Sequence, residues 1–233
     1  MEQRVAVVIV AGGSGRRMGG ALPKQFAIVG GEPVLVRTIN TFARALCGAK
    51  IVVVLPASQM EYWHNLAARF RVARHSVVEG GVERFHSVRA GVESLTEGCD
   101  LIAVQDGVRP LVSEELIVRT VECAAQHGAA GPVVLPVDSF RQVAEESGES
   151  CIVNRSQLRV VQTPQIFAAD ILRAAYDVEY SPEFTDDASV VERAGFKVAL
   201  CEGDRRNIKI TTPEDLYIAE ALLEARRDEE QMR

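Results

Sequence analysis

Short apolar runs recur along the chain and alternate with longer stretches in which apolar residues return every three or four positions. The runs are rich in Val, Ile and Leu without strict alternation, which is typical of strands covered on both faces. Together the two patterns predict a mostly parallel sheet flanked by helices. We expect strands at residues 5–10, 51–55, 76–78, 101–105, 131–137, 158–161 and 197–201.

Residue chemistry also indicates several helix ends. Ser113 suits the N-cap of a helix that stops at Gly128. Residues 212–215 (Thr-Pro-Glu-Asp) have a capping-box pattern and are expected to open the last helix, with Pro213 at its first position. Beyond Ala225 the chain becomes strongly charged, so we expect this helix to fray there.

A polar stretch at residues 138–154 interrupts this rhythm, with a turn-like Glu-Ser-Gly-Glu at its centre. It predicts a protruding hairpin or loop, and an ordinary surface excursion fits the local sequence equally well. The chain has 233 residues, no internal repeat and no low-complexity linker. We therefore interpret residues 1–233 as one α/β domain.

Charge and cysteine content narrow the class of protein. The formal net charge is −6 and the sequence pI is about 5.4, which argues against a general nucleic-acid binder with a basic surface. Five scattered cysteines without a CxxC pair are best explained as free thiols in a reducing cytoplasm. The apolar run at residues 5–11 is too short for a membrane span and no signal-cleavage site follows it. We expect a cytoplasmic protein without membrane attachment.

The first predicted strand leads directly into a glycine-rich loop. Its residues are Ala11, Gly12, Gly13, Ser14 and Gly15, and the cations Arg16, Arg17 and Lys24 follow. Glycines let backbone N–H groups converge on an anion, so loop amides and cations together predict a cradle for a triphosphate. A purely structural tight turn is the alternative.

Three standard glycine motifs do not fit this loop. The Gly-Lys-Ser/Thr triplet of a P-loop is absent. A dinucleotide fingerprint fails because Met18 stands at its third glycine and because the second strand ends in Leu55 and Pro56 without the expected acid. A nucleophile elbow around Ser14 fails because Arg16 replaces its last glycine.

Six ordered segments, which cover nearly the whole chain, resemble the 2-C-methyl-D-erythritol 4-phosphate cytidylyltransferases of the non-mevalonate isoprenoid pathway. They are residues 11–25 (with Ala-Gly-Gly-Ser-Gly-Arg-Arg-Met and Pro-Lys-Gln), 80–88 (with Gly-Gly-Val-Glu-Arg and Ser-Val), 106–110 (Asp-Gly-Val-Arg-Pro), 162–165 (Gln-Thr-Pro-Gln), 185–189 (Thr-Asp-Asp-Ala-Ser) and 207–211 (Asn-Ile-Lys-Ile-Thr). The resemblance implies a Rossmann-like α/β nucleotidyltransferase fold with a mixed sheet. It also implies a homodimer formed through a β-arm, which residues 138–154 would supply.

The implied reaction is the transfer of CMP from CTP to a small polyol phosphate, with release of pyrophosphate. Both substrates are anions, so such a displacement needs positioning and cations that neutralise charge. By resemblance, Arg17 and Lys24 stabilise the transition state. The nucleotide would be bound by Ala11, Gly12, Gly13, Ser14, Gly15, Lys24, Gly81, Val82, Ser87, Asp106 and Gly107. The family often has an acid where Val82 stands, so only a backbone contact would survive there.

The polyol phosphate would be positioned by Asp106, Arg109, Ser139, Arg155, Thr163, Thr185 and Lys209. Ser139 stands about where the family usually has threonine, and Ser139 and Arg155 would serve the partner subunit's site. Asp106 ends an apolar strand, where an acid is typical of a magnesium or substrate-hydroxyl site. Magnesium would be held mainly by CTP phosphate oxygens, because it keeps waters and few protein ligands.

Other functions fit the residues of this chain less well. A ribitol-5-phosphate cytidylyltransferase shares the opening loop, and residues 185–189 and 207–209 favour the methylerythritol enzyme over it. A sugar-1-phosphate nucleotidyltransferase is disfavoured by the motifs of the second half. A dinucleotide-dependent oxidoreductase fails at Met18. A non-catalytic nucleotide-binding protein would be expected to lose its cations, yet Arg17, Lys24 and Lys209 are all present.

Overall fold

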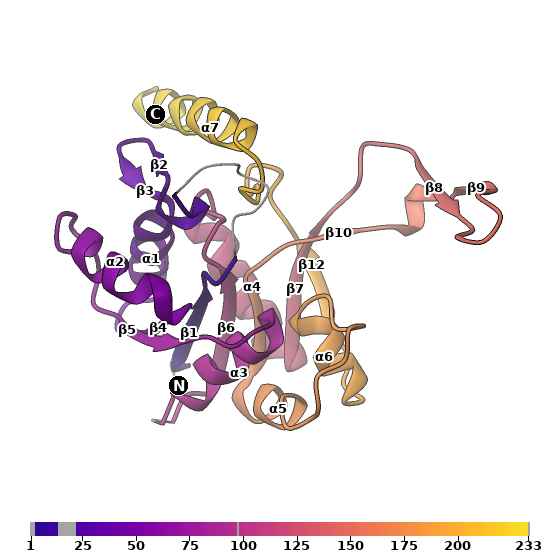
Figure 1. Ribbon diagram of the computed structural model, residues 1–233, viewed down its shortest axis with the longest axis horizontal. Coiled ribbons are helices and arrows are strands. Elements are labelled where there is room, and N and C mark those ends of the chain that lie inside the picture. The colour runs from indigo at the N-terminus through magenta and orange to yellow at the C-terminus, as the bar shows by residue number, and fades with distance from the viewer. Residues whose placement is uncertain (1–2, 14–21, 97, 233) are drawn as a thin grey trace.

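The computed structural model describes residues 3–13, 22–96 and 98–232. Within them, one large sheet has the strand order β10-β7-β11-β6-β1-β4-β5, and β12 also pairs with β7 (Figure 1). The strands are β1 (Val5–Val10), β4 (Lys50–Leu55), β5 (Ser76–Glu79), β6 (Leu101–Asp106), β7 (Ala129–Val134), β10 (Val160–Val161), β11 (Gln165–Ala168) and β12 (Ala199–Glu202). The predicted strands are all present, with bounds shifted by a few residues.

The sheet is mixed and mostly parallel, as predicted. β1 runs parallel to β4 on one side and to β6 on the other, and β4 runs parallel to β5. The pattern analysis missed β11, which lies antiparallel between β6 and β7. The place of β11 depends on the strands beside it, which the local sequence does not specify.

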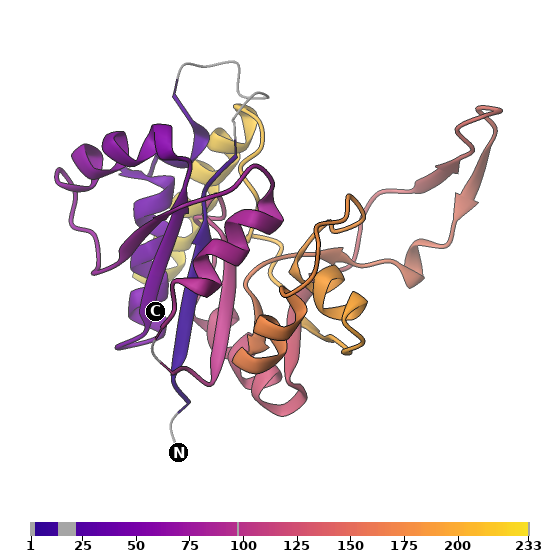
Figure 2. The ribbon, with the colours of Figure 1, turned by 60° about the horizontal axis from the view of Figure 1, so that its bottom comes forward.

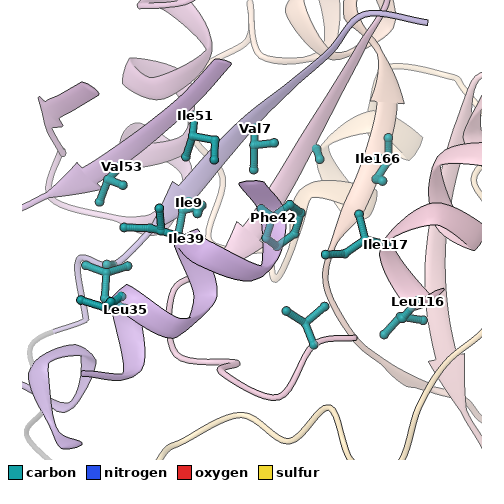
Figure 3. Close-up of a cluster of buried hydrophobic side chains, with 14 of the residues drawn as sticks. Val7, Ile9, Leu35, Ile39, Phe42, Ile51, Val53, Leu116, Ile117 and Ile166 are labelled. Atoms are coloured by element: carbon teal, nitrogen blue, oxygen red, sulfur yellow. The ribbon is translucent and has the colours of Figure 1, made fainter. Parts of the chain in front are cut away.

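Helices cover both faces of this sheet, which explains the apolar runs. α1 (Val34–Ala45), α2 (Ala57–Ala67) and α4 (Glu114–His127) contribute to one buried cluster, while α3 (Arg84–Glu93), α5 (Ala169–Ala175) and α6 (Asp187–Arg193) contribute to the other. Along β1, Val7 and Ile9 point to the first cluster and Ala6 and Val8 to the second. Figure 3 shows the first cluster, with Phe42 of α1 packed near Val7 and Ile117.

The predicted ends of two helices can be compared with the structure. α4 begins as predicted, since Ser113 accepts a hydrogen bond from the N–H of Leu116, and it ends at Gly128 with φ 82°. Half of the capping box predicted for α7 (Glu214–Gln231) is present: the carboxylate of Asp215 accepts the N–H of Thr212, and also that of Thr211, but no side chain among the described residues caps the helix N–H groups in return. The predicted fraying is wrong, because the helix continues to Gln231.

The last helix, α7, lies at the top of the molecule in Figure 1. It packs on the hairpin of β2 (Ile28–Val29) and β3 (Glu32–Pro33), which follows the short 3₁₀ helix η2 (Lys24–Phe26). Val29 of the hairpin and Leu223 of α7 belong to one buried cluster. The C-terminal helix therefore supports the segment that carries Lys24.

The polar stretch forms a protruding β-arm, as predicted. Among the described strands, β8 (Phe140–Val143) and β9 (Ser150–Val153) pair only with each other, and the 3₁₀ helix η3 (Arg155–Gln157) follows them. The arm extends away from the body of the molecule in both views (Figures 1 and 2). All five cysteines are free, as predicted. In the part of the chain that the structure describes, no helix combines the length and apolarity that crossing a membrane requires.

Candidate active site

The candidate site lies where the strand order changes direction, between β1 and β6. From β1 the chain continues to β4 on one side, and β6 lies on the other side. The register pairs Val10 with Asp106, so the end of β6 lies directly beside the start of the glycine loop. Ligands of open α/β sheets bind at the carboxyl ends of strands at such a switch point.

The described part of the loop, residues 11–13, is fixed by η2. The side-chain amide of Gln25 donates to the carbonyl oxygen of Ala11 over 2.8 Å. A Cβ atom at Gly13 would lie 3.4 Å from Cε of Lys24, so this lysine passes beside the loop backbone. The structure thus brings Gly13 and Lys24 together, as the nucleotide prediction requires. Ser14, Gly15, Arg16 and Arg17 lie outside the described residues.

The second loop predicted to bind the nucleotide faces the first. Ser87 is buried at the start of α3, and its hydroxyl donates to the carbonyl oxygens of Gly81 and Glu83. A Cβ atom at Gly12 would lie 3.7 Å from Oγ of Ser87. Val82 is 95% exposed, so its side chain is not packed against the rest of the protein.

Asp106 is the centre of the charged cluster. One carboxylate oxygen lies 2.9 Å from Nζ of Lys209 and 3.4 Å from Nε of Arg109, and the other lies 3.4 Å from Nε of Arg84. Burial would raise the pKa of Asp106, but attraction to these three cations outweighs it and holds the pKa well below its usual range. Asp106 is therefore a buried carboxylate that stays ionised.

Buried polar groups hold this cluster in place. The N–H of Asp106 donates to Oγ1 of Thr163 over 3.1 Å. Asn207, which is fully buried, donates its side-chain N–H to the carbonyl oxygen of Thr163 over 2.8 Å, and its own carbonyl oxygen accepts from Arg109 over 2.8 Å. These bonds fix the loop that carries Lys209 against β6.

Close packing around Gly107 requires a glycine at this position. Its N–H donates to the carbonyl oxygen of Val10 over 2.8 Å. A Cβ atom there would lie 3.0 Å from Cβ of Ala11 and 3.1 Å from Cδ1 of Leu35. A larger residue would displace β6 from the start of the glycine loop.

A hollow of about 240 Å³ opens over this cluster. Its lining contains predicted substrate residues from four segments, namely Asp106, Arg109, Thr163, Thr185 and Lys209. Ser139 and Arg155 are exposed on the arm and do not line this hollow. Arg155 contacts the carbonyl oxygen of Val137, within the base of the arm. In one chain, the structure brings together five of the seven predicted acceptor residues.

Sequence reasoning assigned no role to the pair Arg84 and Asp187, although both lie in segments that it quoted. The guanidinium of Arg84 forms two hydrogen bonds with the carboxylate of Asp187, at 2.8 and 2.7 Å. Burial disfavours the charged form of Arg84, but attraction to Asp187 and Asp106 raises its pKa. Each motif contains a charged residue, which was the available sign of a functional role. Nothing in the sequence near Arg84 or Asp187 indicated that the two would pair.

The family model described as IspD, 2-C-methyl-D-erythritol 4-phosphate cytidylyltransferase, matches residues 5–225. The chain belongs to this family. It is therefore a nucleotidyltransferase of the cytidylyltransferase class, and not a dinucleotide-dependent oxidoreductase. The family's match includes every segment that builds the site described above.

Individual relatives agree with the family assignment. A 2-C-methyl-D-erythritol 4-phosphate cytidylyltransferase of Phocaeicola vulgatus is 48% identical over 93% of this chain and 98% of that protein. The crystal structure of the enzyme of the same name from Thermus thermophilus has a TM-score of 0.75 at 34% identity, over 94% of this chain and 98% of the other. That of a 4-diphosphocytidyl-2C-methyl-D-erythritol synthase from Anaerococcus prevotii has a TM-score of 0.80 at 28% identity, over 95% and 99%. These matches confirm the predicted fold class.

Proposed function

We propose that this protein joins the phosphate of 2-C-methyl-D-erythritol 4-phosphate to the cytidylyl group of CTP at the carboxyl edge of its sheet. An oxygen of the acceptor phosphate attacks the α-phosphorus of CTP, and the bond between the α-phosphorus and the bridging oxygen of pyrophosphate breaks. The products are 4-diphosphocytidyl-2-C-methyl-D-erythritol and pyrophosphate. The observation that carries this proposal is the cation cluster around Asp106 beside the glycine loop and Lys24.

The two sides of the site suit two different anions. On one side, the backbone of Gly12 and Gly13 with Lys24 suits a triphosphate, and Arg17 follows in the chain. On the other side, Arg109 and Lys209 suit the acceptor phosphate, because a planar fork and a compact ammonium both bind phosphate oxygens. Bringing the anions together in line requires charge neutralisation more than covalent help.

Asp106 would orient cations rather than act as a general base. The acceptor phosphate is already ionised at neutral pH, so its attack requires no proton removal by the protein. The low pKa of Asp106 also makes it a poor proton acceptor. We assign it the task of holding Lys209 and Arg109 at the position where the acceptor phosphate binds.

Magnesium is proposed as the cofactor, but with CTP and not the protein as its main ligand. Among the described residues, no group of three or more His, Cys, Asp or Glu side chains is arranged to hold a metal. Both oxygens of Asp106 already contact cations, so its surroundings do not fit a metal ligand. Phosphate oxygens and water, which Mg²⁺ prefers, are the remaining ligands.

We further propose a cytoplasmic homodimer joined through the arm. Large apolar side chains are exposed along the arm and the strands at its base, at Leu135, Val137, Phe140, Val143, Ile152, Val160 and Val161. Exposed large apolar side chains in this number favour burial against another copy of the chain. Ser139 and Arg155, which do not line the hollow of their own chain, would then complete the partner's site.

A substrate matrix tests the reaction. CTP, UTP, GTP and ATP are each incubated with Mg²⁺ and one of three acceptors: methylerythritol phosphate, ribitol 5-phosphate or a hexose 1-phosphate. We expect pyrophosphate release with CTP and methylerythritol phosphate far above every other combination. A preference for ribitol 5-phosphate would replace the proposed acceptor, and release with UTP and a hexose phosphate would overturn the proposal.

A further inference from the structure

Two helices begin on opposite sides of the site. α3 starts at Arg84, directly after the loop of Gly81 and Val82 that faces the glycine loop. α6 starts at Asp187, directly after Thr185, which lines the hollow. The first residue of α3 therefore follows a segment for the nucleotide, and the first residue of α6 follows a segment for the acceptor.

Arg84 connects these helix starts with the end of β6. Its two terminal nitrogens bind the two oxygens of Asp187, and its Nε lies 3.4 Å from an oxygen of Asp106. Asp187 is fully buried, and the hydroxyl of Tyr176 donates to it over 2.6 Å. A bidentate arginine–carboxylate pair fixes both distance and plane, so the direction of the guanidinium is set.

The contacts of Arg84 differ from those of the predicted substrate cations. Lys209 and Arg109 hold one oxygen of Asp106, and Arg84 holds the other. The guanidinium of Arg84 lines the same hollow and its side chain is 30% exposed, but both of its terminal nitrogens are hydrogen-bonded to Asp187, a protein group. Arg84 is thus arranged to act through protein carboxylates.

Aromatic packing also connects the start of α3 with the segment before α6. The ring of Phe85 stacks on Tyr176 at 4.9 Å between centroids and on Phe184 at 5.6 Å. These contacts attach the segment before α6 to α3 through residues adjacent to the ion pair. The segment that carries Thr185 has its position set by α3 rather than by the sheet alone.

The nucleotide loop is anchored without Arg84. The N–H of Gly80 donates to the carbonyl oxygen of Leu55 over 2.8 Å. Gly91 lets α3 approach β1 closely, since a Cβ atom there would overlap Val8. Loss of Arg84 would therefore disturb the acceptor side more than the nucleotide side.

We propose that Arg84 is a positioning residue for the acceptor half of the site, where it ties Asp106 of β6 to Asp187 at the start of α6. This inference rests on the proposed cytidylyl transfer. Arg84 sets where Lys209, Arg109 and Thr185 stand relative to bound CTP, and does not itself bind the acceptor phosphate. Misplacement of about 1 Å at a remote residue is enough to lower a rate about 100-fold.

The test compares Arg84→Lys, which keeps the charge but loses the fork, with Asp187→Asn and with the double variant. We expect each single variant to lower kcat/KM for methylerythritol phosphate by about 10- to 100-fold, with a raised KM for this acceptor as part of the loss. The affinity for CTP, measured by calorimetry, should stay unchanged. Because both variants break one connection, the double variant should be no worse than the worse single variant.

Arg89→Lys is the matched control, since Arg89 lies on the same helix in an exposed ion pair with Glu93 and should leave all constants unchanged. If Arg84 only stabilises the fold, its loss should lower the thermal midpoint, the active fraction and therefore kcat. The KM for the acceptor should then not change by itself. That result, an unchanged KM for the acceptor, or a loss confined to CTP affinity would each overturn the inference.

Failure of the proposed function looks different from failure of this inference. If the wild-type protein transfers no cytidylyl group to methylerythritol phosphate, the proposed function fails before any variant is compared. If the wild-type protein is active and Arg84→Lys matches it in both substrates, only the role of Arg84 is wrong.

Discussion

Lys209 and Asp106 form an ion pair of 2.9 Å at the base of the hollow, between a loop near the C-terminus and the end of a central strand. Lys209 is half exposed, whereas Asp106 is buried. The carboxylate therefore contacts the ammonium on one side, and the ammonium also lines the hollow, where it is accessible to a bound anion. This arrangement explains how an acid can assist the binding of an anion.

Replacing Lys209 by Met is expected to lower turnover with methylerythritol phosphate by about 10²- to 10³-fold, the usual effect of losing one preorganised charged donor. The rate of pyrophosphate release measures it. Lys197→Met is the control, because Lys197 is exposed and lies outside the site. Equal activity of the two variants would contradict the role of Lys209.

Lys24 tests the opposite side of the site. It is buried beside Gly13, so Lys24→Met should lower kcat by about 10²- to 10³-fold through loss of charge at the triphosphate. Lys50→Met, at the amino end of β4 and thus at the opposite edge of the sheet, should retain full activity. Neutralising Lys24 and Arg17 together with turnover at the wild-type level would refute the account of catalysis.

The depressed pKa of Asp106 predicts a pH-dependent contribution to stability. A folded-state pKa below the unfolded value stabilises the fold above the ordinary carboxylate pKa, and this stabilisation is lost as the pH falls below about 4. The gap in unfolding free energy between the wild-type protein and Asp106→Asn should be constant at neutral pH and should narrow in acid. Urea unfolding at stepped pH measures it; a gap that widens in acid would contradict the low pKa.

The arm provides a test of the dimer. Ile152 and Val143 share one face of the hairpin, since Ile152 pairs with Arg141 two residues before Val143, and both are exposed. Ile152→Asp should remove about 1.5–3 kcal/mol of apolar burial per subunit. Because a two-fold dimer carries the substitution twice, the dimer should be roughly 10²- to 10⁴-fold weaker.

Sedimentation velocity at several concentrations would report that change, and activity should fall on dilution together with the dimer fraction. Glu146→Gln, in the exposed turn of the same hairpin, is the control and should leave the sedimentation profile unchanged. A variant that stays monomeric and fully active at high dilution would show that Ser139 and Arg155 do not serve a partner subunit.

Features that depend only on neighbouring residues could be predicted from the sequence. Apolar runs such as Val5–Val10 specify strands buried on both faces, and the change to glycine at Gly12 places a loop at the strand end. Asp106 could be placed at an equivalent strand end for the same reason. Local hydrophobicity and backbone freedom are enough to decide such features.

Contacts between residues far apart in the chain could be known only from the folded structure. Arg84 and Asp187 are 103 positions apart, and nothing near either residue selects the other from the many charged residues of the chain. The same holds for the insertion of β11 between β6 and β7. Ion pairs and strand neighbours depend on the packing of whole elements, because burial and Coulombic attraction act between groups that the fold, and not the local sequence, brings within a few ångströms.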